Sequence, residues 1–159
     1  MGVQVEELTA LYREWAMRLV TERWGSTRMV TRGSLYDLAA VPGFVALTGG
    51  SPVGLLTYRI SGQGCEILSL DSTAEGQGVG TALLEAVRTA AANQGCRRLW
   101  LITTNDSMHA LRFYQKRGFR LVTVYRNALD ESRKLKPEIP RVGIDGIPLR
   151  DEIELEMVL

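Results

Sequence analysis

Glycines crowd one short stretch of the chain, between an apolar run and a second run with helical periodicity. Gly76, Gly78 and Gly80 follow the apolar residues 68–70 and precede the apolar stripe that starts at Val79. A strand, a glycine bend and a helix in this order gather backbone N–H groups at the helix N-terminus, where they hold an anion. Because glycine has no Cβ, it also lets a ligand approach the backbone closely. The stretch therefore predicts a binding site for a phosphate or pyrophosphate.

Two common glycine motifs do not fit this stretch. The dinucleotide fingerprint needs glycines at its first, third and sixth positions, and Thr81 stands at the sixth position counted from Gly76. A Walker-type phosphate loop needs Gly-Lys-Ser or Gly-Lys-Thr, and no such triplet follows. The spacing of Glu75, Gly78 and Gly80 resembles instead the Gln/Arg-x-x-Gly-x-Gly/Ala signature of the GNAT superfamily, the general N-acetyltransferases. Glu75 stands where that family usually has Gln or Arg.

A second segment carries the same resemblance. Asn105 is followed by Ala110, by the pair Phe113-Tyr114 and by Gly118-Phe119, in the order of another GNAT motif. Together the two motifs cover roughly residues 64–125. The chain therefore resembles the GNAT family over its central part.

The resemblance implies a fold, an activity and a set of contacts. It implies a mixed, mostly antiparallel α/β sheet with helices on both faces, and transfer of an acetyl group from acetyl-coenzyme A to an amine. The glycine bend would hold the pyrophosphate, and the strand end near Leu70 would pair with the pantetheine arm and offer an N–H to the thioester carbonyl. The implied cofactor-binding residues are Leu68, Leu70, Glu75, Gly76, Gln77, Gly78, Val79, Gly80, Thr81, Asn105, Ala110 and Tyr114.

Tyr114 is the candidate acid that protonates the departing thiolate. A phenol has a reference pKa near 10 and a thiol near 8.5, so proton donation between them is roughly balanced. The alternative is that Tyr114 is only a half-buried helix residue, as tyrosines often are. The lone histidine, His109, lies about 140° from Tyr114 on a helix with 100° per residue, which places it on the solvent side.

The acceptor amine requires a base. An amine with a pKa near 10.4 is neutral in only about one molecule in a few thousand at pH 7, so a base, or a water chain to one, should help. Glu66 is the candidate by resemblance, because it lies on the strand that leads to the glycine bend, and Asp71 is the other choice. Either carboxylate could instead be an ordinary strand-edge group.

Composition indicates one soluble domain over residues 1–159 and sets limits on partners. The 159 residues carry a formal net charge of +1, which gives no case for binding bulk nucleic acid. No apolar run approaches a membrane span, and the N-terminus does not resemble a secretory signal. Cys65 and Cys96 have no metal-ligand spacing and are expected to be reduced thiols of a cytoplasmic protein, so no metal is implied.

Periodicity and turn residues predict the elements in order. The expected helices cover residues 6–24, 34–40, 79–94, the segment opened by Asn105, and a short segment capped by Asn127. The expected strands cover residues 28–32, 43–47, 53–60, 65–70, 99–103, 119–124 and 152–159.

The connection over residues 126–150 is unusually long, and it is either a functional loop or a surface excursion. Its basic residues Arg133, Lys134 and Lys136 could receive an anionic acceptor or cover the cofactor's phosphates, or simply keep the loop solvated. By resemblance, the loop that joins the last two strands borders the acceptor site. The acceptor, the size of the acyl group and a possible homodimer stay open, and the rival function is a non-catalytic acyl-coenzyme A-binding or regulatory module.

Overall fold

The structure, a computed structural model, describes residues 2–159 and divides into two compact units. The first unit comprises the described residues up to 29, residues 37–99 and Leu159. The second comprises Val30–Tyr36 and Trp100–Val158. Each unit is described by itself below, and the expectation of a single domain over residues 1–159 stays a prediction.

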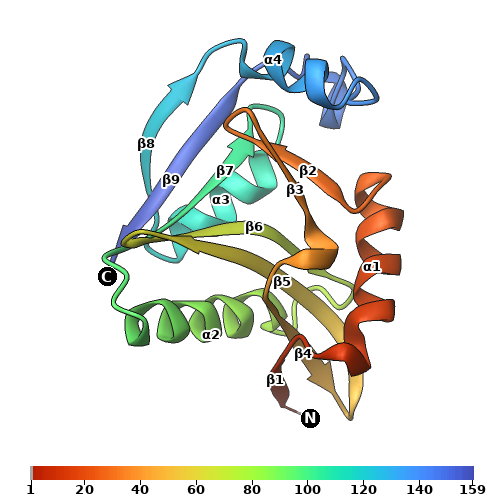
Figure 1. The fold of residues 1–159 in the computed structure, drawn as a ribbon, viewed down its shortest axis with the longest axis vertical. Coiled ribbons are helices and arrows are strands. Elements are labelled where there is room, and N and C mark those ends of the chain that lie inside the picture. The colour runs from red at the N-terminus through yellow and green to blue at the C-terminus, as the bar shows by residue number, and fades with distance from the viewer. Residues whose placement is uncertain (1) are drawn as a thin grey trace. The chain divides into compact units, whose positions relative to one another are not determined.

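The first unit is built on an antiparallel sheet. Its strands, each antiparallel to the next, are β1 (Val3–Glu7), β4 (Gly43–Thr48), β5 (Ser51–Ser61) and β6 (Gly64–Ser72). Its helices are α1 (Ala10–Trp24) and α2 (Val79–Asn93), with a single 3-10 turn, η1 (Leu38–Ala40) (Figure 1). The short strands β2 (Arg28–Thr31) and β3 (Ser34–Asp37) form a separate two-stranded sheet, and their residues Val30–Tyr36 belong to the second unit.

Helices α1 and α2 lie on opposite faces of this sheet. Consecutive strand residues point to opposite faces, and two neighbours on β5 identify the helix on each side. A Cβ on Gly54 would collide with the side chain of Val79 on α2, which explains why glycine stands there. Leu55 is in register with Asp71 on β6, and Asp71 accepts a hydrogen bond from Trp24 at the end of α1.

The second unit contains the last two strands and the long connection between them. Its strand order is β7-β9-β8, with bounds β7 (Arg98–Thr104), β8 (Arg120–Tyr125) and β9 (Glu152–Val158), and β8 is antiparallel to β9. Its helices are α3 (Met108–Lys116) and α4 (Ala128–Leu135), with a 3-10 turn, η2 (Ile144–Gly146). The nine strands and four α-helices of residues 2–159 confirm the predicted mixed, mostly antiparallel α/β class.

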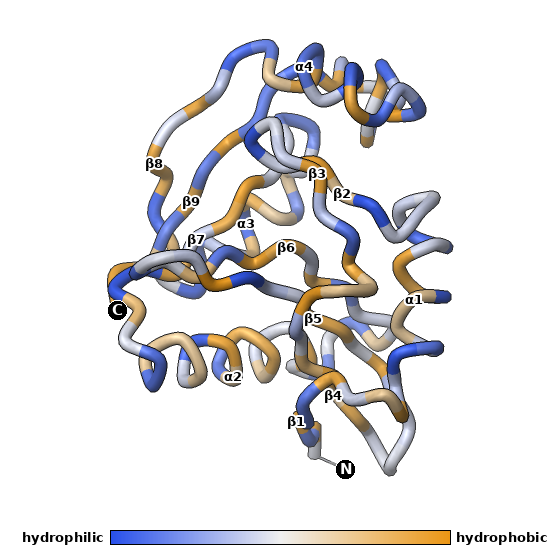
Figure 2. The backbone as a smooth tube through the Cα atoms, in the orientation of Figure 1, coloured by the Kyte–Doolittle hydropathy of each residue, from blue (hydrophilic) through white to orange (hydrophobic). Residues whose placement is uncertain are grey.

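The two units differ in the hydropathy of their elements. Strand β4 is largely apolar along its length, whereas α4 is mostly polar between its apolar ends (Figure 2). The fully buried side chains of the first unit come from its strands, from both helices and from η1, and they include Val20, Val45, Leu55 and Leu83. Among residues 2–159, no helix is long and apolar enough to span a membrane.

Three predictions of secondary structure were wrong: two helices begin later than predicted, and one predicted helix is mostly a strand. The first helix begins at Ala10 rather than at residue 6, because the residues before it pair with β4 as strand β1. Residues 34–40 were predicted as a helix, but Arg32 and Gly33 both have positive φ and turn the chain into the β2–β3 hairpin, so only η1 remains helical. Asn105 does not open a helix, because α3 begins at Met108.

Candidate active site

Open space surrounds the glycines of the bend. Gly76 and Gly78 have φ values of +74° and +76°, a region that side chains with a Cβ rarely adopt. A Cβ built on either residue would meet nothing within 4 Å. Neither glycine is therefore required by packing against the rest of the first unit, and both are required by the path of the backbone.

The N-terminus of α2 offers unsatisfied donors. Gly78 is its N-cap and supplies no side-chain cap for the start of the helix. Within the described residues, the turn and loop hydrogen bonds do not use the N–H of Gly76, Gln77 or Gly78 as donor. The helix is held from behind, because Val79 is buried. Free N–H groups and the positive end of the helix dipole together favour an anion.

The side chains around the bend leave this opening accessible. Glu75, Gln77 and Thr81 are exposed, and Gly80 is partly exposed in the first turn of α2. Glu75 therefore brings a carboxylate to the surface of the bend, where the related signature has a neutral or cationic side chain.

Strand β6 is irregular just before the bend. Thr57 of β5 pairs with Ser69, whereas the next residue, Tyr58, pairs with Ile67. Leu68 is thus the extra residue of a β-bulge, and its backbone does not continue the regular ladder. Bulges of this kind are common beside active sites because they free or re-aim backbone groups. Leu70 follows the bulge and is half-buried.

Glu66 is buried in an ion pair. Its side chain lies opposite Arg59 in the strand register, and the Arg59 Nη1 lies 3.3 Å from Glu66 Oε1. The residue is only 2% exposed. Its carboxylate therefore has a cationic partner within the same strand pair.

Asp71 is a second buried carboxylate on β6. The residue is 6% exposed, and its Oδ2 accepts a hydrogen bond of 3.1 Å from Trp24 Nε1. Burial raises the pKa of the Asp71 carboxyl above its ordinary value, and the Trp24 hydrogen bond and the charge of Arg23 oppose that rise.

Tyr114 lies in an aromatic cluster of the second unit. It is buried on α3, and its ring makes edge contacts with Phe113 and Phe119, with centroids 5.2 and 5.3 Å away. Ala110 lies one turn before Tyr114 and is half-buried. His109 is exposed, as the helical period predicted.

Asn105 ties the end of β7 to the long connection. Its Nδ2 donates to the carbonyl of Pro148 at 2.8 Å, and its Oδ1 accepts from the N–H groups of Arg150 and Asp151 at 3.0 and 2.9 Å. The backbone N–H of Asn105 also donates to the carbonyl of Asp151. The Oδ1 is thus committed within the second unit, and Nδ2 retains one further hydrogen for a ligand.

Asp106 makes a second tie that the sequence analysis missed. Its carboxylate is buried, accepts from the Thr104 hydroxyl and accepts from the N–H of Ile144 at 2.9 Å. A Cβ on Gly143 would overlap this carboxylate, so only glycine fits there. Asp106 stands two residues before the observed start of α3 at Met108, and an aspartate near a helix start is a signal for a local hydrogen bond to the backbone.

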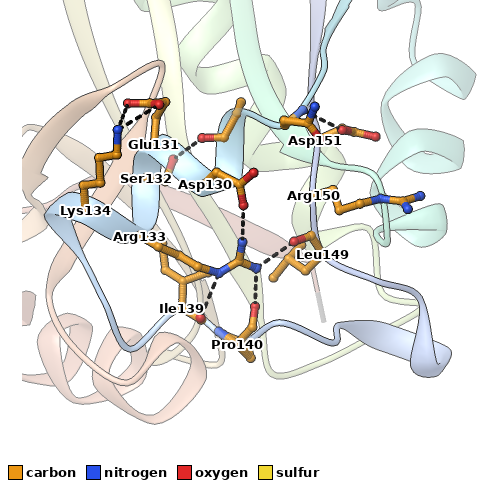
Figure 3. A network of polar contacts seen from close by, with 12 residues as sticks. Asp130, Glu131, Ser132, Arg133, Lys134, Ile139, Pro140, Leu149, Arg150 and Asp151 are labelled. Atoms are coloured by element: carbon orange, nitrogen blue, oxygen red, sulfur yellow. Dashed lines mark hydrogen bonds and ion pairs between the residues drawn. The ribbon is translucent and has the colours of Figure 1, made fainter.

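Arg133 joins distant parts of the connection through hydrogen bonds to its backbone. Its guanidinium donates to the carbonyls of Leu149, Pro140 and Ile139 at 2.6, 2.7 and 3.3 Å, and lies 3.5 Å from Asp130 (Figure 3). Only 11% of the Arg133 side chain is exposed. Of the three alternatives for the basic residues, Arg133 therefore fits none, because it is an internal brace.

The remaining basic and sulfur groups have simpler roles. Lys134 pairs with Glu131 one turn earlier on α4. Cys65 and Cys96 are buried and free, and burial raises the pKa of the Cys65 thiol to about 12, which keeps it protonated and unreactive. Within residues 2–159, no group of three His, Cys, Asp or Glu side chains could hold a metal ion.

The predicted site residues thus fall into two groups. The first unit brings together the β6 bulge, Glu66 and the glycine bend, which includes the predicted contacts Leu68, Leu70, Glu75, Gly76, Gln77, Gly78, Val79, Gly80 and Thr81. The second unit holds Asn105, Ala110 and Tyr114.

Comparisons with known proteins show the family and the fold. A family model described as "Acetyltransferase (GNAT) family" matches residues 7–119. The chain is 44% identical over 139 residues to the uncharacterized protein YdhI of Bacillus subtilis, covering 87% of each chain. Among solved structures it is similar to an IAA acetyltransferase from Bacillus cereus, with a TM-score of 0.75, 25% identity and coverage of 99% and 100% of the two chains. It also shares its fold with a GNAT family acetyltransferase from Elizabethkingia anophelis with acetyl-CoA bound, with a TM-score of 0.71, 20% identity and 99% coverage of both chains.

Proposed function

Because the chain belongs to the GNAT acetyltransferase family, we propose that it transfers the acetyl group of acetyl-coenzyme A directly to a primary amine. The observation that carries this proposal is the open glycine bend at the uncapped N-terminus of α2, directly after the bulge of β6. A pyrophosphate needs several N–H donors and a positive dipole, and the bend offers both. The residues present therefore fit the group that the family uses.

The first unit would bind and polarise the thioester. The N–H groups of residues 76–81 would hold the pyrophosphate, and the irregular backbone from Leu68 to Leu70 would pair with the pantetheine arm. A backbone N–H at the bulge would then donate to the thioester carbonyl, and one such donor contributes about 3 kcal/mol to the transition state. The family chemistry needs no covalent intermediate, and neither buried cysteine is suited to form one.

The second unit would supply the acid. Tyr114 would donate its phenolic proton to the sulfur as the carbon–sulfur bond breaks, and its edge contacts with Phe113 and Phe119 would fix the ring on α3. Ala110, one turn earlier, has a small side chain that would let the cofactor approach the helix, and Asn105 would donate its remaining Nδ2 hydrogen. One of the two buried carboxylates, Glu66 or Asp71, would take a proton from the acceptor amine.

The rival proposal is a non-catalytic acyl-coenzyme A-binding module. Glu75 favours it slightly, because an exposed carboxylate beside the bend repels phosphate. The burial of Tyr114 on α3 does not distinguish the transferase from the binding module, because a packed tyrosine is compatible with both functions. The acceptor is also open, because the fold of these enzymes does not determine which amine they use. We expect a small or protein-borne amine in the same cytoplasmic setting that the composition indicates.

A thiol-release assay on a panel of amines separates the two functions. With Tyr114→Phe, transferase activity should fall about 10²-fold or more, whereas the dissociation constant for acetyl-coenzyme A should change less than twofold. Tyr12→Phe is the matched control. The Tyr12 hydroxyl lies at the surface, where it donates a hydrogen bond of 3.4 Å to the Glu6 carboxylate. Binding of acetyl-coenzyme A without acetylation of any amine would favour the rival module.

A further inference from the structure

The first unit buries four polar side chains, and all four come from one strand pair. Among its described residues, the buried polar side chains are Thr57, Glu66, Ser69 and Asp71, with exposures of 0, 2, 5 and 6%. Burying a polar group costs free energy unless it is hydrogen-bonded or ion-paired. A row of such groups in a small unit is therefore a feature to explain rather than an ordinary part of a core.

Strand register places all four on the face that α1 covers. Thr57 is in register with Ser69, and Asp71 follows Ser69 by two residues, so these three share a face. The extra residue of the bulge at Leu68 restores Glu66 to the same face, opposite Arg59 on β5. The face is that of α1, because Trp24 reaches Asp71 from it.

The four groups differ in how far their hydrogen bonds are satisfied. The hydroxyls of Thr57 and Ser69 bond to each other, and Glu66 pairs with Arg59. For Asp71, the only side-chain partner in the described residues is Trp24, which occupies Oδ2. The Oδ1 of Asp71 is thus the acceptor in this row that is left for a ligand or for water.

We propose that Asp71 is the general base for the acceptor amine, and that Trp24 is the residue that positions it. This inference rests on the proposed function and decides between its two carboxylates. Glu66 is the weaker choice, because its carboxylate already has Arg59 as a partner at 3.3 Å. The amine would then approach the sheet on the face of α1.

The proton balance of this step is simple. The acceptor enters as an ammonium ion and gives one proton to Asp71 Oδ1, which becomes a carboxylic acid. The freed lone pair forms the carbon–nitrogen bond, the carbon–sulfur bond breaks, and the sulfur receives the proton of Tyr114. The second proton on nitrogen returns to the Tyr114 phenolate through water, and Asp71 releases its proton to solvent, so each turnover frees one proton.

The charges on this face suit the role. Burial raises the pKa of the Asp71 carboxyl, which makes it a better base than a solvated carboxylate. The Trp24 hydrogen bond and the charge of Arg23 on α1 oppose that rise, because both stabilise the ionised carboxylate. Arg59 and Glu66, the other charged groups on the face, neutralise each other.

Asp71→Asn tests the base directly. The variant should lose about 10²- to 10³-fold in kcat at saturating acetyl-coenzyme A, with the dissociation constant for acetyl-coenzyme A unchanged within twofold. Its midpoint of unfolding at pH 7 should equal or exceed that of the wild type, because the amide still accepts from Trp24 and removes a buried charge. Asp145→Asn, at an exposed turn, is the matched control and should leave all three quantities unchanged.

Trp24→Phe tests the positioning role in the free protein. It keeps the ring but removes the N–H, so the pKa of Asp71, followed by carbon NMR, should rise above the wild-type value. The acidic limb of the kcat/KM profile should move to higher pH by the same amount, because activity requires the ionised carboxylate. A purely structural role for Trp24 would lower stability and leave this limb in place.

The outcomes separate this inference from the proposed function. If the wild type acetylates an amine but Asp71→Asn does so equally well, Asp71 is not the base, and the proposed function stands. The inference is also overturned if the acidic limb of the kcat/KM profile stays at the same pH in Trp24→Phe. It is likewise overturned if Asp71→Asn lowers the midpoint of unfolding in proportion to the loss of activity. If the wild type acetylates no amine, the proposed function fails and this inference fails with it.

Discussion

The glycine bend and the connection over residues 126–150 are both irregular and rich in backbone polar groups, but they use those groups in opposite ways. At the bend, the N-cap of α2 has no side-chain partner and the glycines face open space. In the connection, Arg133 donates to three carbonyls, and Asn105 and Asp106 bind the N–H groups of residues 144, 150 and 151. One irregular segment keeps its hydrogen-bonding capacity, and the other satisfies it internally.

The difference separates a binding element from a structural one. Exposed backbone donors at a helix N-terminus are tolerated because a ligand or water completes them. A long connection without regular structure needs internal partners to stay ordered, because buried backbone polar groups cost free energy when unpaired. The connection is therefore a structural segment of the second unit. Its length predicts a functional loop, but hydrogen bonds from side chains of this unit hold it in place.

Removing the brace should have the largest effect on stability. Arg133→Met keeps the apolar stem but deletes the hydrogen bonds to Ile139, Pro140 and Leu149, and we expect a loss of about 2–4 kcal/mol in the free energy of unfolding. Urea denaturation measures it. Lys134→Met, one residue along, should cost less than about 0.5 kcal/mol because its partner Glu131 is exposed. Equal losses in the two variants would mean that the connection is not braced by Arg133.

Cutting the tie at Asn105 should have the next largest effect. Asn105→Ala leaves the N–H groups of Arg150 and Asp151 without their acceptor, so we expect a loss of about 1–2 kcal/mol in the free energy of unfolding. If Asn105 acts mainly on the connection, acetyl-coenzyme A affinity stays within about twofold. Asn93→Ala, at the exposed end of α2, is the control. A loss of affinity with stability intact would instead make Asn105 chiefly a cofactor contact.

A methyl group at the glycine bend should weaken binding of acetyl-coenzyme A and leave the connection over residues 126–150 unchanged. Gly78→Ala places a Cβ on a residue with φ +76°, at a cost of about 1–2 kcal/mol, which the bend can relieve only by changing its path. We expect acetyl-coenzyme A affinity to fall about tenfold in calorimetric titration. Gly95→Ala carries the same strain at φ +80° beyond the other end of α2. If both variants lost affinity equally, the bend would not be the anion site.

The smallest effect should come from Glu75. Glu75→Gln restores the residue type usual in the related signature and removes an exposed negative charge beside the bend, so affinity should rise about two- to threefold. The gain should fade as salt is added, because exposed charges are screened over about 10 Å at 0.1 M. Glu85→Gln, an exposed glutamate further along α2, should change nothing. A loss of affinity in Glu75→Gln would show that the glutamate itself contacts the ligand.

Strong local patterns made most of the fold predictable. The stripe from Val79 and the stop at Gly95 predicted α2, and the Gly49-Gly50 turn predicted the β4–β5 hairpin. Residues 34–40 were predicted as helix because no local pattern reveals that Arg32 adopts a positive φ and turns the chain into a hairpin. Strand β1 was hidden because its pairing partner, β4, lies far along the chain.

The candidate site divides in the same way. The glycine bend is a local motif, so sequence alone located it. Asp106 and Arg133 act through backbone groups distant in sequence, and the partner of an aspartate or arginine cannot be read from its neighbours. The choice between Glu66 and Asp71 likewise depended on cross-strand register and on Trp24, which only the fold brings to Asp71.

The most direct test of the account is a calorimetric titration of the wild-type protein with acetyl-coenzyme A and, in parallel, with coenzyme A. The open donors at the start of α2 predict a dissociation constant on the order of micromolar for both, which corresponds to about 8 kcal/mol of binding free energy. Absence of binding at millimolar concentrations would contradict the account, because the glycine bend would then be an open turn without a ligand.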